Sequence, residues 1–204
     1  MTTNDKIIRT FLRIVLEKEL EQYKTEKKLP AEIFEEFGVS HGTARIDIAV
    51  INGIMHGYEI KSDRDTLIRL SDQMDIYNSV FDQITLVVGK SHLYDAINIV
   101  PDWWGIMIAK FDAEESIVLQ YIREPKDNKE QDSVEIARLL WREEALEILE
   151  KTGEARGFRS KPRDVIYEKL STIFDQQNLG KEVREALFSR RDWRSDVLPV
   201  LNGG

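Results

Sequence analysis

Charged residues at alternate positions mark one stretch of the chain, RIDIAVINGIMHGYEIK, which runs from Arg45 to Lys61. Asp47 lies in its first half, and Glu59 and Lys61 lie in its second half, with mostly apolar residues at the positions between them. Because side chains on a strand alternate between faces, the pattern predicts one face that is core and one face that carries chemistry. Two carboxylates on neighbouring strands can share one divalent cation, and hard oxygen ligands suit Mg²⁺.

Asn52-Gly53 in the middle of this stretch indicates a β-hairpin. A two-residue loop would pair Ile51 with Ile54 and would put the apolar residues of the two strands on opposite faces. Pairing Ile51 with Met55 instead aligns the apolar residues and brings both carboxylates and the lysine onto one face. This second register needs a three-residue loop or a bulge, for which Gly53 provides an unusual backbone angle. We therefore expect the second register.

A cation held by Asp47 and Glu59 would polarise a scissile phosphate and lower the pKa of an attacking water. The main-chain carbonyl of Ile60 could supply a further metal ligand. Lys61 would orient the water or stabilise charge that develops on the phosphate. Glu-x-Lys on a strand also occurs as an ordinary solvated face, but the Asp on the matched face favours a magnesium-dependent site for phosphodiester hydrolysis, in which Mn²⁺ can substitute.

The composition narrows the class of protein. The chain has 204 residues, no cysteine and a formal net charge of −8. Cysteine-free chains have no disulfide and no thiolate zinc site, and His41, His56 and His92 are too scattered for a metal site. The acidic balance argues against a protein that coats nucleic acid through bulk charge, although it allows a nuclease. The sequence shows no long apolar run and no signal peptide, so we expect a bacterial-type cytoplasmic protein that does not enter a membrane.

The order of the expected elements predicts a mixed α/β sheet with helices on its faces. The elements are assigned from apolar residues at helical spacing, from alternating apolar residues and from continuous apolar runs. Besides the hairpin, helices are expected over 5–28, 65–81 and 92–100, and strands over 31–39, 84–88, 105–109 and 117–122.

The pattern of polar and apolar residues changes after Pro125. Residues 126–132 are polar and indicate a linker, and helices are expected over 133–150, 163–177 and 180–190, with Gly180 separating the last two. The chain is therefore divided into an α/β core over 1–125 and a C-terminal helical extension over 126–204. The stretch from Lys151 to Arg194 holds 11 basic and 7 acidic residues, so it is positively charged within an acidic chain.

Asp47 followed by Glu59-Ile60-Lys61 resembles the PD-(D/E)XK nuclease superfamily, whose core is restriction-endonuclease-like. Ile46 stands where that superfamily often has a proline before the first acid. The resemblance implies a mixed sheet flanked by helices and a metal-dependent nuclease site. It also implies an earlier glutamate, for which Glu36 and Glu17 are both candidates.

Gln73 and Tyr77 are spaced by one helical turn and resemble the Gln-xxx-Tyr feature of the RecB-like branch. The resemblance implies that Gln73 orients catalytic side chains or contacts DNA, whereas Tyr77 could equally be a core aromatic residue. A longer pattern, HGYEIKSDRDTLIRL with later segments up to Arg190-Arg191-Asp192-Trp193, is similar to an uncharacterised bacterial family catalogued by a locus tag. That family is itself placed in the nuclease superfamily and brings no substrate.

Other residues could contact nucleic acid. Arg64 and Arg69 could hold phosphates, although exposed helix charges with nearby aspartate partners are the simpler interpretation. Trp103-Trp104 could stack on bases, although packing is favoured by the strand that follows. Four basic residues before an expected helix fit nucleic-acid contact and a solvated linker equally well; they are Arg156, Arg159, Lys161 and Arg163.

The sequence thus predicts a Mg²⁺-dependent deoxyribonuclease in which Asp47 and Glu59 bind metal with the Ile60 carbonyl. Lys61 assists the water or the transition state, and Gln73 orients the site. The alternative is a protein on the same fold that has lost turnover and binds nucleic acid or a protein partner. Cleavage of RNA instead of DNA also stays open, and the sequence leaves the oligomeric state undecided.

Overall fold

The computed structural model describes residues 2–190 and contains one six-stranded sheet in the order β1-β2-β3-β4-β5-β6. The parallel pairs are β3 with β4 and β4 with β5, and the other neighbours are antiparallel. This confirms the predicted mixed α/β fold with a C-terminal helical part. The strands are β1 (Glu32–Val39), β2 (Ala44–Ile51), β3 (Met55–Lys61), β4 (Gln83–Gly89), β5 (Gly105–Phe111) and β6 (Ile117–Arg123).

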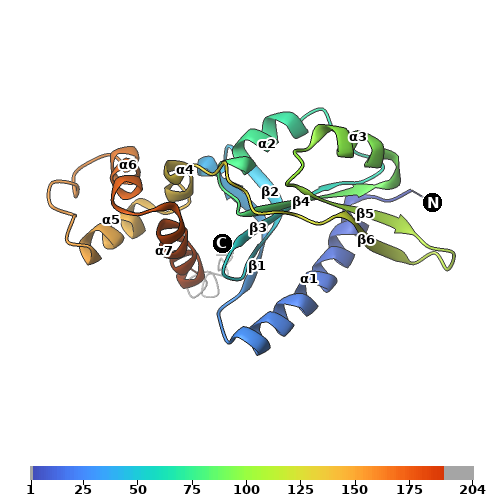
Figure 1. Cartoon of the computed structure of the whole chain (residues 1–204), viewed down its shortest axis with the longest axis horizontal. Helices are drawn as coiled ribbons and strands as arrows, with labels where there is room; N and C mark the ends of the chain where they lie inside the picture. The colour runs from blue at the N-terminus through green and yellow to red at the C-terminus, as the bar shows by residue number, and fades with distance from the viewer. Residues whose placement is uncertain (1, 191–204) are drawn as a thin grey trace, which may run out of the picture.

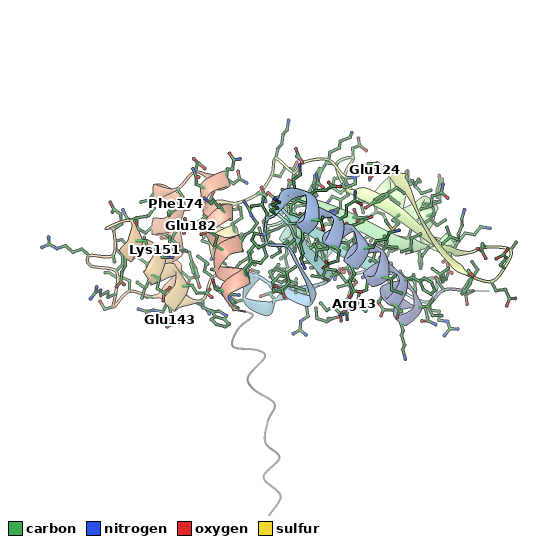
Figure 2. All side chains as sticks on the ribbon, turned by 90° about the horizontal axis from the view of Figure 1, so that it is seen from below. Arg13, Glu124, Glu143, Lys151, Phe174 and Glu182 are labelled. Atoms are coloured by element: carbon green, nitrogen blue, oxygen red, sulfur yellow. The ribbon has the colours of Figure 1, made fainter. Side chains whose placement is uncertain are left out.

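Helix α1 (Asp5–Lys27) covers one face of the sheet, as Figures 1 and 2 show. The helix begins where the Asn4 side chain accepts a hydrogen bond from the main-chain N–H of Ile7, a typical N-cap. Its buried residues recur every fourth position and are Ile8, Leu12, Leu16 and Leu20. They pack on the even-numbered hairpin residues Ile48, Val50, Tyr58 and Ile60, which confirms the predicted helix and most of the predicted core face. The even-numbered Ile46 belongs instead to the apolar cluster on the opposite face.

The opposite face of the sheet is covered by α2 (Leu70–Asn78) and α3 (Leu93–Ile99) (Figure 1). Here the odd-numbered hairpin residues Ala49, Ile51 and Met55 belong to a second apolar cluster that includes Leu70 and Tyr77 of α2. The prediction that the odd face is devoted to chemistry is therefore wrong. Both faces are core, and the charged side chains occupy only the region where β2 begins and β3 ends.

The hairpin has the predicted register. Ile51 pairs with Met55 and Ile48 pairs with Tyr58. The turn consists of the three residues between the strands, and the N–H of Asn52 bonds to the carbonyl of Ile54 at 3.1 Å. Gly53 has φ of 100°, a backbone angle that a residue with a Cβ atom rarely adopts. The turn therefore fixes which residues of the two strands share a face.

The connection between β3 and α2 is longer than predicted, because α2 begins at Leu70 and not near residue 65. The side chain of Asp65 accepts hydrogen bonds from the N–H and the hydroxyl of Ser62, at 2.7 and 2.6 Å, and closes a turn there. Ile68, which lies within the helix predicted over 65–81, precedes α2 and is 81 % exposed. The polar turn at Ser62–Asp65 thus competes successfully with helix formation.

Asp63 fixes three segments to one another just after β3. One carboxylate oxygen accepts hydrogen bonds from the N–H and the hydroxyl of Thr3, at 2.7 and 2.8 Å, and the other accepts two bonds of 2.9 Å from Ser91. Burial disfavours the charged form, but these hydrogen bonds outweigh it and lower the pKa of Asp63 to about 2. The chain after Lys61 is thereby held against the start of α1 and the connection between β4 and α3.

The C-terminal helices lie beside the sheet (Figure 1), and they are α4 (Ser133–Ala137), α5 (Arg142–Lys151), α6 (Arg163–Ile173) and α7 (Gln176–Ser189). The single helix predicted over 133–150 is wrong. A new helix starts after Trp141, whose N–H bonds to the Glu144 carboxylate at 2.7 Å. The buried residues of α4–α7 and of the sheet form one continuous apolar cluster, and the domain boundary at 125 stays a prediction.

The predicted role of Gly180 as a helix separator is also wrong, because Gly180 lies buried inside α7. The break between α6 and α7 falls earlier, at Phe174, whose backbone is extended. Helix α7 then starts because the Asp175 side chain accepts a bond from the N–H of Asn178 at 2.8 Å. No helix within residues 2–190 has the length and apolar character needed to span a bilayer. Arg191, Asp192 and Trp193, which belong to the sequence resemblance, lie outside the described residues.

Candidate functional site

Asp47, Glu59, Lys61 and Gln73 line one cleft of about 720 Å³. Main-chain pairing of β2 with β3 ends at Ile48 and Tyr58. Beyond that point the Asp47 carboxylate bridges the two strands, since its Oδ2 accepts the N–H of Ile60 at 2.7 Å. The structure therefore brings together the three charged groups that the hairpin register placed on one face, and it adds the glutamine of α2.

Glu59 and Lys61 form a buried ion pair at the base of this cleft. The side chain of Lys61 donates to Glu59 Oε1 at 2.6 Å, and the two residues are only 8 % and 2 % exposed. Burial, followed by the negative charge of Asp47, raises the pKa of Glu59, although Lys61 opposes the shift. A buried pair of this kind contributes little net stability, so its presence here needs another reason.

Gln73 and Tyr77 hold the ion pair from the side of α2. Lys61 Nζ donates to Gln73 Oε1 at 3.3 Å, and Gln73 Nε2 donates to the hydroxyl of Tyr77 at 3.0 Å. That hydroxyl lies 3.0 Å from Glu59 Oε2 and 2.7 Å from the carbonyl of Arg45, so it donates to one of the two. Tyr77 is both a fully buried core aromatic residue and a member of the polar network, so the two interpretations of this residue are compatible.

Arg9 of α1 is a member of the site that the sequence analysis did not identify. It donates to Asp47 Oδ1 at 2.6 Å and to the main-chain carbonyl of Asp47 at 3.2 Å. Burial raises the pKa of Asp47, while the Ile60 N–H and the charge of Arg9 oppose that shift. The only sequence signal for Arg9 is its spacing of four residues from Asp5, to which it is also paired.

The structure separates the two glutamate candidates. Glu36 Oε1 lies 3.0 Å from Arg9 Nη1, so one guanidinium group links Glu36 to Asp47. Glu36 also has φ of 50°, an uncommon backbone angle for a residue with a side chain. Glu17 instead pairs with Arg13 on the exposed side of α1, and neither glutamate is among the residues that line the cleft. Glu36 is thus the glutamate that lies near the site.

Three arginines surround the cleft on its open side, and they are Arg45, Arg64 and Arg69. All three are exposed, and within residues 2–190 their guanidinium groups have no ion-pair or hydrogen-bond partner. Unpaired guanidinium groups are well suited to contact phosphate. The interpretation of Arg64 and Arg69 as charges paired with nearby aspartates is therefore not supported.

The other candidates lie away from the cleft. Trp104 is fully buried and donates to Asn78 Oδ1 at 2.8 Å, and Trp103 packs against it, which confirms the packing interpretation. Arg156 and Arg159 line a separate hollow of about 620 Å³ among the C-terminal helices. Arg159 pairs there with Glu150 at 3.0 Å. Contact of this basic segment with nucleic acid stays a prediction.

The donor set of the cleft fits a hard divalent cation. Two carboxylates close enough for their charges to interact, those of Asp47 and Glu59, face a polar cleft beside the main chain of Ile60. Within residues 2–190 no three acidic, histidine or cysteine side chains form a complete protein cage for a metal. Mg²⁺ does not require such a cage, because it commonly takes one or two carboxylates and keeps several waters.

The sequence of the chain is similar to that of a known protein family. The profile of the family described as bacteriophage P4 protein cII matches residues 11–198. Protein cII of Enterobacteria phage P4 is 40 % identical to the chain over 65 residues, which are 32 % of this chain and 25 % of that protein. The chain thus spans about a quarter of the length of this curated relative. A solved structure of the SPO1766 protein of unknown function from Silicibacter pomeroyi is 17 % identical, with a TM-score of 0.37 over 65 % of this chain and 86 % of that one.

Proposed function

We propose that this chain, which belongs to the bacteriophage P4 protein cII family, is a metal-dependent nuclease that hydrolyses DNA phosphodiester bonds. One observation carries the proposal. The buried Glu59–Lys61 pair faces Asp47 in a cleft whose open side is lined by unpaired arginines. The resemblance to the PD-(D/E)XK superfamily rests on the same residues and supports the same reading.

Asp47 and Glu59 are the residues that would hold Mg²⁺ or Mn²⁺, with the main-chain carbonyl of Ile60 as a further ligand. A bound divalent cation would polarise the phosphodiester and lower the pKa of the attacking water. Both carboxylates must be ionised for this purpose. The pKa values of both carboxylates are raised, so they take up protons at a higher pH than ordinary carboxylates do. We therefore expect acidification to weaken cation binding sooner than it would at a site with ordinary carboxylates.

Lys61 supplies a fixed positive charge beside the reacting phosphate. Its ammonium group is held by Glu59 and Gln73, so it needs little reorganisation when negative charge develops during attack. Gln73 is a positioning residue in this scheme, because it bonds to Lys61 with its oxygen and to Tyr77 with its nitrogen. The α2 side of the cleft thus orients the acid–lysine pair.

Arg45, Arg64 and Arg69 are the groups that would hold the phosphates on either side of the scissile bond. Phosphate contacts of this kind position a strand without reading its bases. No group in the cleft is assigned to the sugar, so RNA is a second substrate to be tested. We place the reaction in the cytoplasm, as the sequence analysis predicts.

One observation favours the alternative of an inactive protein on the same fold that binds nucleic acid or a protein partner. Both carboxylates that would bind metal already form ion pairs within the chain. Asp47 is paired with Arg9, and Glu59 is paired with Lys61. A site neutralised in this way could bind a phosphate chain through its arginines and yet hold no metal. The two functions differ in their requirement for Asp47.

The test compares wild type with Asp47→Asn and with the matched control Glu17→Gln. Both changes neutralise a carboxylate that is paired with an arginine of α1, but only Asp47 lies in the cleft. Linear, branched and single-stranded DNA and RNA are incubated with each protein and Mg²⁺. We expect Asp47→Asn to lose about 100-fold or more in rate and Glu17→Gln to keep the wild-type rate.

Two results would count against the nuclease. Equal rates for Asp47→Asn and wild type would place the cleavage outside this cleft. Binding of these nucleic acids without cleavage of any of them, at several Mg²⁺ and Mn²⁺ concentrations, would favour the inactive binding protein.

A further inference from the structure

Arg9 joins three carboxylates that come from three different elements. Its guanidinium group lies 3.2 Å from Asp5 Oδ2, 3.0 Å from Glu36 Oε1 and 2.6 Å from Asp47 Oδ1. These residues belong to α1, β1 and β2. The Arg9 side chain is only 21 % exposed, so its contacts are partly shielded from water. A cation of the chain thus lies against the carboxylate proposed to bind metal.

We infer that Arg9 is a positioning residue that sets the affinity of the cleft for divalent cations by competing with them for Asp47. The inference rests on the proposed function of the cleft and deepens it. It predicts that the wild-type site binds cation weakly, because binding requires the guanidinium group to leave Asp47 Oδ1.

The hydrogen bonds of Asp47 are the first argument for competition. Oδ2 is engaged by the N–H of Ile60, and Oδ1 is engaged by Arg9. An incoming cation would therefore meet Arg9 at the oxygen that the hairpin leaves available. Two cations at contact distance in a partly buried site repel each other strongly.

The other partners of Arg9 are the second argument. Asp5 accepts from both Nε and Nη2 of Arg9, at 3.3 and 3.2 Å, and Glu36 pairs with Nη1. If the guanidinium group leaves Asp47, these two carboxylates still neutralise it. The exchange of Arg9 for a metal therefore leaves neither the arginine nor Asp47 without an opposite charge.

Arg13 provides a matched control one helical turn along α1. Its guanidinium group also joins two carboxylates, those of Glu17 and Glu35, at 2.8 and 2.6 Å. Neither of these carboxylates lines the cleft, whereas Asp5 and Asp47 do, and the Arg13 side chain is 54 % exposed. Arg13 is labelled in Figure 2 on the helix that crosses the sheet. Loss of either arginine removes one positive charge from the same helix, but only loss of Arg9 frees Asp47.

The experiment measures Mn²⁺ binding by calorimetry, without nucleic acid, for the full chain and for Arg9→Gln and Arg13→Gln. We expect Arg9→Gln to bind Mn²⁺ about tenfold more tightly than wild type, which corresponds to about 1.4 kcal/mol. We expect Arg13→Gln to bind as wild type does. Circular dichroism confirms that each variant is folded. If Arg9→Gln does not fold, Arg9→Met, which also removes the positive charge, replaces it and should also bind more tightly.

The outcomes separate this inference from the proposed function. If wild type binds Mn²⁺ and Arg9→Gln binds equally or more weakly, the competition is wrong, while the metal site stands. If Arg13→Gln tightens binding as much as Arg9→Gln, the effect is one of general charge and the inference is wrong. If neither wild type nor any Arg9 variant binds Mn²⁺, the inference and the metal-dependent nuclease both fall.

Discussion

Strand β3 carries two polar clusters, one on each face, and they differ in kind; the first is buried and the second is partly buried. On the α2 face, Glu59 and Lys61 form an ion pair that Gln73 and Tyr77 support. On the α1 face, the ring of His56 stacks on Tyr58 with 4.2 Å between centroids and bonds to Thr85 at 2.9 Å. The first cluster is built from opposite charges, whereas the second is built from neutral groups.

The surroundings of the two clusters differ as well. The charged cluster opens into the arginine-lined cleft. The neutral cluster borders a hollow of about 310 Å³ that Glu19 and Glu124 also line. Burial lowers the pKa of His56 to about 3, so this residue is uncharged at neutral pH. His56 thus has a strongly shifted pKa without a charged partner, whereas the cleft of the proposed function combines buried opposite charges with exposed arginines.

The largest expected effect comes from breaking the charged cluster. Lys61→Met leaves Glu59 buried without its cation, which should cost about 3–5 kcal/mol in the free energy of unfolding. The same change should reduce cleavage by about 100-fold or more. Urea denaturation and a nuclease assay with Mg²⁺ measure the two effects.

The double variant Glu59→Gln/Lys61→Met is the control for this prediction. It removes both charges together, so most of the lost stability should return while cleavage stays absent. If the double variant is as active as wild type, the ion pair has no role in catalysis. If Lys61→Met is as stable as wild type, the pair is not buried as the structure describes.

The neutral cluster should make the protein sensitive to acid. The pKa of His56 is lowered in the folded protein from an ordinary value of 6.5 to about 3, so the unfolded chain binds the proton first as the pH falls. The contribution of uncharged His56 to the free energy of unfolding is therefore fully present above about pH 6.5. It is lost progressively as the pH falls from 6.5 to 3. From pH 6.5 to 4 this loss amounts to about 2–3 kcal/mol.

Replacing His56 by Gln should remove that part of the pH dependence. Urea denaturation at a series of pH values should give a smaller slope between pH 6.5 and 4 for His56→Gln than for wild type. Equal slopes would mean that His56 is accessible to protons in the folded state, and the contrast between the two clusters would then weaken.

The smallest effect should come from Tyr77→Phe, which removes one hydroxyl group from the charged cluster. Gln73 Nε2 loses its acceptor, and either Glu59 Oε2 or the carbonyl of Arg45 loses its donor, so we expect a cost of about 1–2 kcal/mol in stability. The cleavage rate should fall by less than it does in Lys61→Met. The matched control is Tyr167→Phe, because Tyr167 is equally buried and donates to the carbonyl of Leu140 at 2.9 Å, far from the cleft.

The control should lose similar stability and keep the wild-type cleavage rate. Equal rates for Tyr77→Phe and wild type would show that Tyr77 contributes packing alone. A similar loss of rate in Tyr167→Phe would show that general destabilisation, and not the network, lowers the activity.

The hairpin register and the convergence of Asp47, Glu59 and Lys61 could be predicted because they depend on local alternation. The charged residues of the hairpin are at odd positions, and the predicted pairing puts Ile48, Val50, Tyr58 and Ile60 on one face. The same logic found the strands and α1. Alternation along the hairpin does not show that α2 packs on the odd face. The burial of Glu59 depends on that packing and so could not be predicted from the hairpin alone.

The remaining errors have comparable causes. Arg9 lies 38 residues before Asp47, and nothing in its own surroundings in the sequence indicates that contact. The helix predicted over 133–150 breaks before Trp141, a residue type that rarely starts a helix. The residue type of Gly180 predicts a break, whereas the capping side chain of Asp175 decides where α7 begins. At the two helix boundaries, side-chain hydrogen bonds outweighed the helix preference of the single residue. For Arg9, the contact is with a residue distant in the sequence.

The bonds between Thr3 and Asp63 have a consequence for the order in which the protein can fold during synthesis. Thr3 leaves the ribosome 60 residues before its partner, and Ser91 follows a further 28 residues later. Helix α1 can form early with its Asn4 cap, but its start cannot be tied to the sheet until β3, the turn after it and the connection between β4 and α3 have all been made. The nascent chain thus gains its final N-terminal anchor only after the whole of the proposed catalytic hairpin has emerged.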